Sequence, residues 1–110
     1  MNNDELKFYK YGEPKALLNI KLQSRDAWAF PYTYLAHIQF IASGKLWLLY
    51  TTRAVLIEGR NLQELYETLV AGEVQWIREG NEKLENSVPE KEPFIAKITI
   101  LSVDEYETKS

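Results

Sequence analysis

Residues 55–79 contain the clearest signals in the sequence of where secondary-structure elements begin and end. They predict a strand, a helix and a second strand in direct succession. Residues 55–58 are a β-rich run. Asn61 is a favoured N-cap residue, and Glu64 stands three positions later, which is the spacing of a capping box. Apolar residues then recur at helical spacing until Gly72, which suits the left-handed position that ends a helix. One short helix between strands is therefore the first constraint on the fold.

Alternating apolar and polar residues predict the remaining strands. These strands cover residues 16–22, 33–42, 45–51, 74–77 and 94–103. Ser43-Gly44 separates two of the apolar runs and is typical of a hairpin. The run at residues 45–51 is apolar on both faces, as in a central strand that is covered on both sides. In the last run, four residues are predicted to face the core: Phe94, Ala96, Ile98 and Ile100.

A single domain is expected over residues 1–110, because a chain of this length buries one core without disulfides or metals. Residues 1–14 are expected to form an edge strand or a tail. Residues 80–93 are polar, acidic and interrupted twice by proline, which predicts a flexible loop. Residues 104–110 are expected to be a charged tail.

The predicted order of elements is four strands, one helix and two strands, which indicates an α+β fold with a mainly antiparallel sheet. One short helix does not cover about six strands. We therefore expect a strongly curled sheet or a partial barrel, or a sheet whose second face packs against another copy of the chain. The last of these arrangements predicts a homodimer.

Composition restricts the classes of function. The chain has no cysteine, which excludes disulfides, a thiol nucleophile and a cysteine-based metal site, and which suits the cytoplasm. Its apolar runs are too short for a membrane helix. The net charge of −3 disfavours general affinity for nucleic acid, since phosphates are bound mainly by Lys and Arg.

Catalytic patterns are weak, so we expect no catalytic residues, no cofactor and no metal. His37 is the only histidine, and it lies in the middle of a predicted strand without a nearby acid in the sequence. The sequence I-E-G-R-N-L at residues 57–62 lacks the pattern of a phosphate-binding loop. It is similar to the second motif of Sm-like RNA-binding proteins, which carry their helix before the sheet. Here the predicted helix follows the motif, and no binding residues are transferred.

The candidate functional surface is an aromatic segment that follows a predicted turn. It interleaves one cation with four rings: Arg25, Trp28, Phe30, Tyr32 and Tyr34. Pro31 places this segment at a sheet edge, at a bulge or in a loop. Protein interfaces are enriched in such residues, and single-stranded nucleic acid stacks on them. The reading that we favour for the rings themselves is that they cap one end of the core.

Three functions remain open at this stage. The favoured hypothesis is a non-enzymatic protein-interaction module that forms a homodimer. The second is a nucleic-acid-binding module, which requires several cations on one face beside the aromatic rings: Lys21, Arg25, Lys45, Arg53 and Arg60. The third is a small-ligand-binding protein or an enzyme, with a pocket near His37, Trp47 and Trp76.

Overall fold

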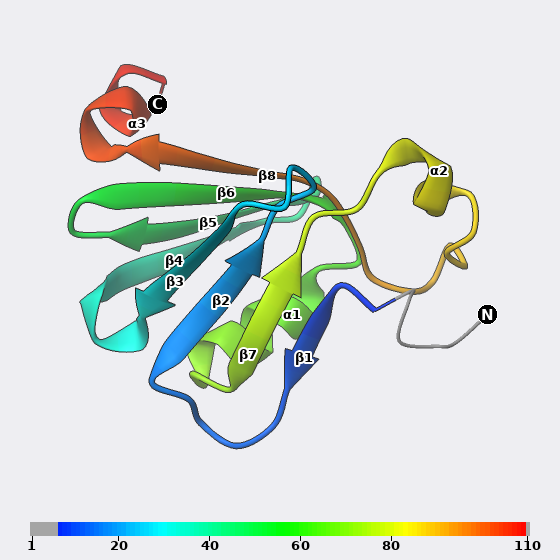
Figure 1. The fold of residues 1–110 in the computed structure, drawn as a ribbon, viewed down its shortest axis with the longest axis horizontal. Helices are drawn as coiled ribbons and strands as arrows, with labels where there is room; N and C mark the ends of the chain where they lie inside the picture. Colours follow the sequence, from blue (N-terminus) through cyan, green and yellow to red (C-terminus); the bar gives the residue numbers. More distant parts are fainter. Residues whose placement is uncertain (1–6, 110) are drawn as a thin grey trace.

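The structure, a computed structural model, describes residues 7–109 apart from the side chains of Glu82 and Lys109, and within them it forms eight strands in two four-stranded sheets (Figure 1). The predicted α+β class is confirmed. Residues 1–6 of the predicted N-terminal segment and Ser110 of the predicted tail lie outside the described residues. No helix within residues 7–109 is long and apolar enough to cross a membrane.

Sheet A is mixed, with the strand order β1-β7-β2-β3. Its strands are β1 (Tyr9–Tyr11), β7 (Val74–Arg78), β2 (Leu17–Lys21) and β3 (Ala27–Pro31). Strands β2 and β7 run parallel, whereas the other two pairs are antiparallel. The predicted N-terminal edge strand is thus present as the short β1, at one edge of the sheet.

Sheet B is antiparallel throughout, with the strand order β4-β5-β6-β8. Its strands are β4 (Leu35–Ile41), β5 (Lys45–Tyr50), β6 (Arg53–Arg60) and β8 (Phe94–Ser102). Gly44 closes the predicted β4–β5 hairpin with a φ of 112°, and its N–H donates to the Ile41 carbonyl oxygen at 3.0 Å. Strand β5 is internal to the sheet, as its doubly apolar sequence predicts.

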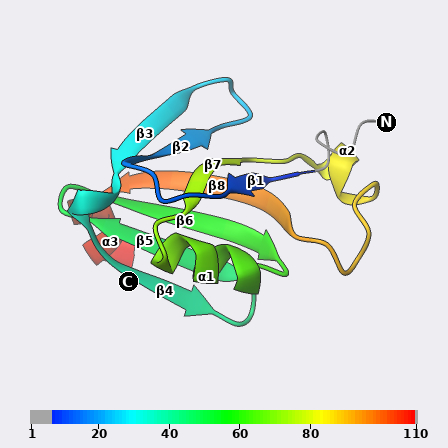
Figure 2. The same cartoon turned by 90° about the horizontal axis from the view of Figure 1, so that it is seen from below.

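The two sheets face each other across one hydrophobic core. Sheet A contributes Leu18 and Ile20, and sheet B contributes Leu46 and Leu48; all four side chains are fully buried. Helix α1 (Gln63–Val70) lies beside β4 and β7, at one side of the gap between the sheets (Figure 2). It places its own leucines in the same core.

Neither sheet closes into a barrel or curls strongly, in contrast to the expected curled sheet or partial barrel (Figure 2). The physical reason is the aromatic segment, which contributes the edge strand β3, one of the three positions that Pro31 allows. With β1, β2 and β7 it makes a second sheet, and this sheet covers the inner face of sheet B. Sheet B therefore buries its inner face without curling.

The start of α1 differs from the predicted capping box. Asn61 has a φ of 56°, and its side chain donates to the carbonyl oxygens of Glu90 and Glu92 at 2.6 and 3.0 Å. The N-cap position is held by Leu62, which has no capping side-chain bond. Asn61 thus ties the 80–93 segment to the start of the helix. At the other end, Gly72 has the predicted left-handed conformation, with a φ of 70°.

Short helices occupy parts of the segments that were predicted as loop and tail. Helix α2 (Glu82–Glu85) lies within residues 80–93, and helix α3 (Val103–Lys109) follows β8 directly. Tyr106 of α3 packs edge-on against Trp47, with ring centroids 4.9 Å apart. Helix α3 therefore covers part of the outer face of sheet B, the second apolar face of β5.

Candidate functional site

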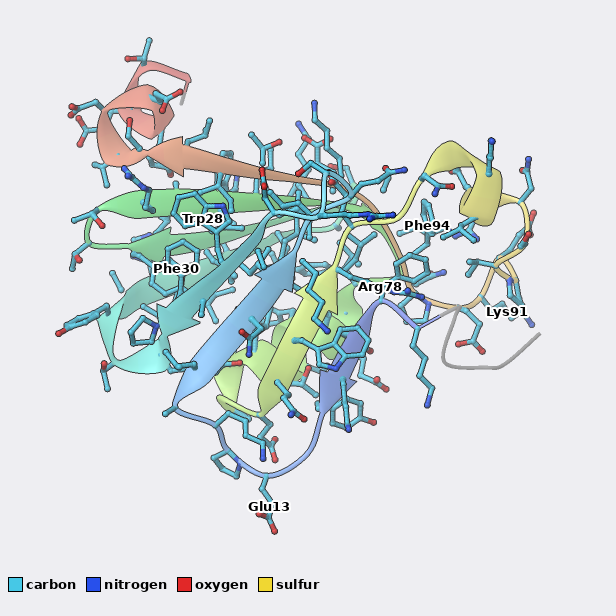
Figure 3. All side chains as sticks on the ribbon, in the orientation of Figure 1. Glu13, Trp28, Phe30, Arg78, Lys91 and Phe94 are labelled. Carbon is cyan, nitrogen blue, oxygen red and sulfur yellow. The ribbon has the colours of Figure 1, made fainter. Side chains whose placement is uncertain are left out.

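The predicted aromatic surface begins as a ladder of stacked rings on β3. Trp28 and Phe30 are parallel, with centroids 5.7 Å apart, and Phe30 stacks on Tyr50 at 4.5 Å (Figure 3). Phe30 is buried, whereas Trp28 is 39% exposed. The cation over Trp28 is Arg53, at 5.9 Å, rather than the predicted Arg25.

The other three predicted residues take separate positions. Arg25 lies exposed in the β2–β3 turn with a φ of 78°. Tyr32 begins the 3₁₀ turn η2 (Tyr32–Tyr34), and its hydroxyl donates to the Val74 carbonyl oxygen at 2.7 Å. Burial raises the pKa of Tyr32 to about 12. Tyr34 is 60% exposed. Phe30 and Tyr32 thus support the core, and Arg25, Trp28 and Tyr34 reach the surface.

The cations that a nucleic-acid surface would need beside these rings do not gather on one face. Lys21 projects from the outer face of sheet A, and Lys45 projects from the outer face of sheet B. The Nη2 atom of Arg60 donates to the Val88 carbonyl oxygen at 2.7 Å, beneath the 80–93 segment. Only Arg53 lies against the predicted aromatic ladder.

The edges of the two sheets differ in how they are protected. Edge strand β1 has three residues, and β3 ends in Pro31. Edge strand β8 is capped, because its Ile98 N–H donates to Glu79 Oε2 at 2.9 Å and its Ile95 carbonyl oxygen accepts from the Gly80 N–H at 2.8 Å. Short strands, prolines and covering groups are the usual protections of an edge.

Strand β4 has seven residues, L-A-H-I-Q-F-I, without a charged side chain or a proline. One bulge, at Ala36, interrupts its pairing with β5 near the start of the strand. Strand β4 is the longest edge strand in residues 7–109 that lacks these protections. The feature was visible in the sequence as an uncharged apolar run, but its position at an edge was not.

A shallow hollow of about 380 Å³ lies beside the first half of β4. One wall comes from β4 and the preceding turn, and the other comes from the end of α1. The lining residues are Tyr32, Leu35, His37, Ile38, Leu69, Val70, Ala71 and Gly72. None of these side chains is charged, and Val70 at the rim is 60% exposed.

The hollow contains His37, as the small-ligand hypothesis predicts, but neither Trp47 nor Trp76. Trp47 packs on Tyr106 at the outer face of sheet B, and Trp76 projects from the outer face of sheet A. No acidic side chain lines the hollow with His37. Within residues 7–109, no three His, Cys, Asp or Glu side chains are grouped closely enough to hold a metal ion.

Comparisons with protein families, with characterised proteins and with solved structures give no match to this chain. The assignment of function therefore depends on the surfaces described above.

Proposed function

We propose that this protein is a non-enzymatic, cytoplasmic protein-interaction module that forms a homodimer through strand β4. The observation that carries the proposal is that β4 is a seven-residue edge strand without a charged side chain or a proline. An edge strand of this kind offers unpaired N–H and C=O groups to another chain. Two copies related by a two-fold axis would pair β4 with β4 antiparallel and join their B sheets.

The surroundings of β4 support a second copy of the chain as the occupant. Isologous pairing is self-complementary, so a neutral strand meets no like charge from its twin. A stable interface commonly buries about 800 Å² on each partner, which is more than one strand supplies. Tyr34 and Val70, each 60% exposed, lie next to the edge and provide further apolar surface.

A small ligand is a poorer occupant of the hollow beside β4. Ligand sites combine apolar walls with a few convergent polar groups that fix the ligand's orientation. The Tyr32 hydroxyl already donates to the Val74 carbonyl oxygen, and the other lining residues apart from His37 are apolar. An apolar side chain from a protein partner suits this lining better.

Sedimentation velocity over a dilution series in the micromolar range tests the proposal. We expect the native chain to sediment as a reversible dimer. The double variant His37→Lys with Gln39→Lys places two cations on each copy of the shared edge, and we expect it to be monomeric. Both replaced side chains are exposed, so the fold should persist, as circular dichroism would verify.

Ala29→Lys is the control, because Ala29 is an exposed residue on an edge strand of the other sheet, β3. We expect this variant to remain dimeric. A native chain that is monomeric at every concentration would refute the homodimer. If Ala29→Lys dissociated the dimer and the β4 double variant did not, the interface would lie on sheet A and the proposal would be wrong.

A further inference from the structure

The outer face of sheet A carries positive charge in a chain whose net charge is negative. The four strands of this sheet contain Lys10, Lys21 and Arg78 and no Asp or Glu. Figure 1 looks onto this face, since α1 lies behind β7 in that view. The side chains of Lys10 and Lys21 are exposed on it.

Strand register places an aromatic ring at the centre of this charge. Trp76 on β7 lies opposite Lys10 on β1 and opposite Asn19 on β2. Trp76 faces outward because it alternates with the buried Ile77, and a bulge at Gln75 allows Val74 to be buried as well. The Lys21 ammonium sits over the Trp76 ring, 4.8 Å from its centroid.

Arg78 lies on the same face, but its guanidinium group already has partners within the protein. Its Nε donates to the Lys7 carbonyl oxygen at 2.6 Å, and its guanidinium lies 5.2 Å from the Phe8 ring (Figure 3). Lys10, Asn19, Lys21 and Trp76 are therefore the residues that face outward together. We name them the Trp76 surface.

We propose that the Trp76 surface binds single-stranded nucleic acid. An unpaired base would stack on the Trp76 ring and displace the Lys21 ammonium, which then becomes available to a phosphate. Stacking of a base on an aromatic ring is stronger than the contact of a cation with a ring at an exposed site, so this exchange is favourable. Lys10 would meet the phosphate on the other side of the ring, and the Asn19 amide would reach a base edge.

A single strand matches this surface better than a duplex or an acidic peptide. Bases in a duplex are already stacked, so a duplex offers its phosphates to the lysines and nothing to the indole ring. An acidic peptide likewise needs the cations and leaves the ring unused. The proposal is independent of the β4 dimer, because the Trp76 surface lies on the other sheet.

Fluorescence anisotropy with labelled oligo-dT and oligo-U tests the proposal at low and rising salt. We expect binding at low salt that weakens as salt increases, because lysine contacts release counterions from the strand. We expect Trp76→Ala to lose roughly tenfold in affinity, in line with the loss of one stacked base, and Trp76→Phe to retain most of it. Lys21→Glu should also weaken binding and reduce its salt dependence.

Lys45→Glu is the matched control, since it makes the same charge change at an exposed position on sheet B. We expect its affinity to equal that of the native chain. Equal losses in Lys21→Glu and Lys45→Glu would overturn the proposal, as would equal affinity for duplex DNA or no binding at low salt. Binding to vesicles of anionic lipid without binding to either oligonucleotide would assign the surface to membranes instead.

Discussion

At the scale of single residues, two tyrosines in adjoining parts of the core carry hydroxyls with different surroundings. The Tyr32 hydroxyl donates to Val74, whereas the Tyr50 hydroxyl is buried without a hydrogen-bond partner in residues 7–109. Tyr50 stacks on Phe30 through its ring, so the ring alone accounts for its packing. An unpaired buried hydroxyl costs the free energy of its lost hydration.

We therefore expect Tyr50→Phe to keep or raise the free energy of unfolding, by up to about 1 kcal/mol. Tyr32→Phe removes a made hydrogen bond and should lower the free energy of unfolding by about 1 kcal/mol. Urea denaturation of both variants measures the difference. A Tyr50→Phe variant that is less stable than Tyr32→Phe would show that the Tyr50 hydroxyl has a partner in solution.

At the scale of elements, one carboxylate joins the two sheets. Glu79, just after β7, accepts from the Gln23 N–H in the β2–β3 turn at 2.9 Å and from the Ile98 N–H of β8 at 2.9 Å. It thereby links an end of sheet A to the outer edge of sheet B. Hydrogen bonds from backbone N–H groups to a charged carboxylate are among the stronger hydrogen bonds in proteins. This link therefore helps to fix the position of one sheet relative to the other.

We expect Glu79→Ala to lower the free energy of unfolding by about 2 kcal/mol, since it leaves a partly buried Ile98 N–H without its acceptor. Glu13→Ala is the control, because Glu13 is an exposed acid in the loop between β1 and β2 (Figure 3). We expect it to change stability by less than about 0.5 kcal/mol. Equal stability of the two variants in urea titrations would contradict the bridging role of Glu79.

The helices and strands were largely predictable, because the alternation of apolar and polar residues and the residues that end an element are local features of the sequence. Residues at helical spacing gave α1, and Gly72 and Gly44 marked the turns that the structure contains. Bulges were not predictable, because they depend on the partner strand. Ala96 was predicted to be buried, but it is exposed because a bulge opposite Gly59 places Ile95 in the core instead. Helix α3 was missed because its sequence is charged and its support is the distant Trp47.

The candidate surface was predicted less well than the strands. Trp28 and Phe30 do share one face of β3, as residues two apart in a strand should. The chain then enters the η2 turn, and this turn separates Tyr32 from Tyr34. Trp76 was predicted to line a pocket and not to lie among cations, because its cationic neighbours Lys10 and Lys21 come from strands far away in the sequence. Strand register, and not spacing along the chain, assembles that surface.

At the scale of the whole molecule, the buried tyrosines predict how stability responds to alkaline pH. Burial raises the pKa of Tyr32 to about 12, and burial also raises the pKa of Tyr50 and of Tyr9, whose hydroxyl donates to Glu64. An unfolded tyrosine ionises near its ordinary pKa of 10.0. The unfolded chain therefore loses these protons first, and the stability present below that pH decreases as pH rises.

We expect the free energy of unfolding to fall between about pH 10 and 12, and the tyrosinate absorbance of the three buried tyrosines to appear together with unfolding. Urea titrations at several alkaline pH values, followed by circular dichroism, measure the decline. The decline should be shallower in Tyr32→Phe, which removes one of the three groups. Full tyrosinate absorbance from a chain that is still folded would contradict the expectation.

The strand order of sheet A also bears on how the molecule is made. Strand β7 is internal to that sheet, between β1 and β2, yet it follows all of sheet B except β8 in the chain. During synthesis, β1, β2 and β3 leave the ribosome before the strand that joins β1 to β2 exists. Hairpins β4–β5 and β5–β6 pair neighbouring segments, so sheet B can begin to form while sheet A is incomplete. Sheet A can therefore be completed only after the last third of the chain, which contains β7, has left the ribosome.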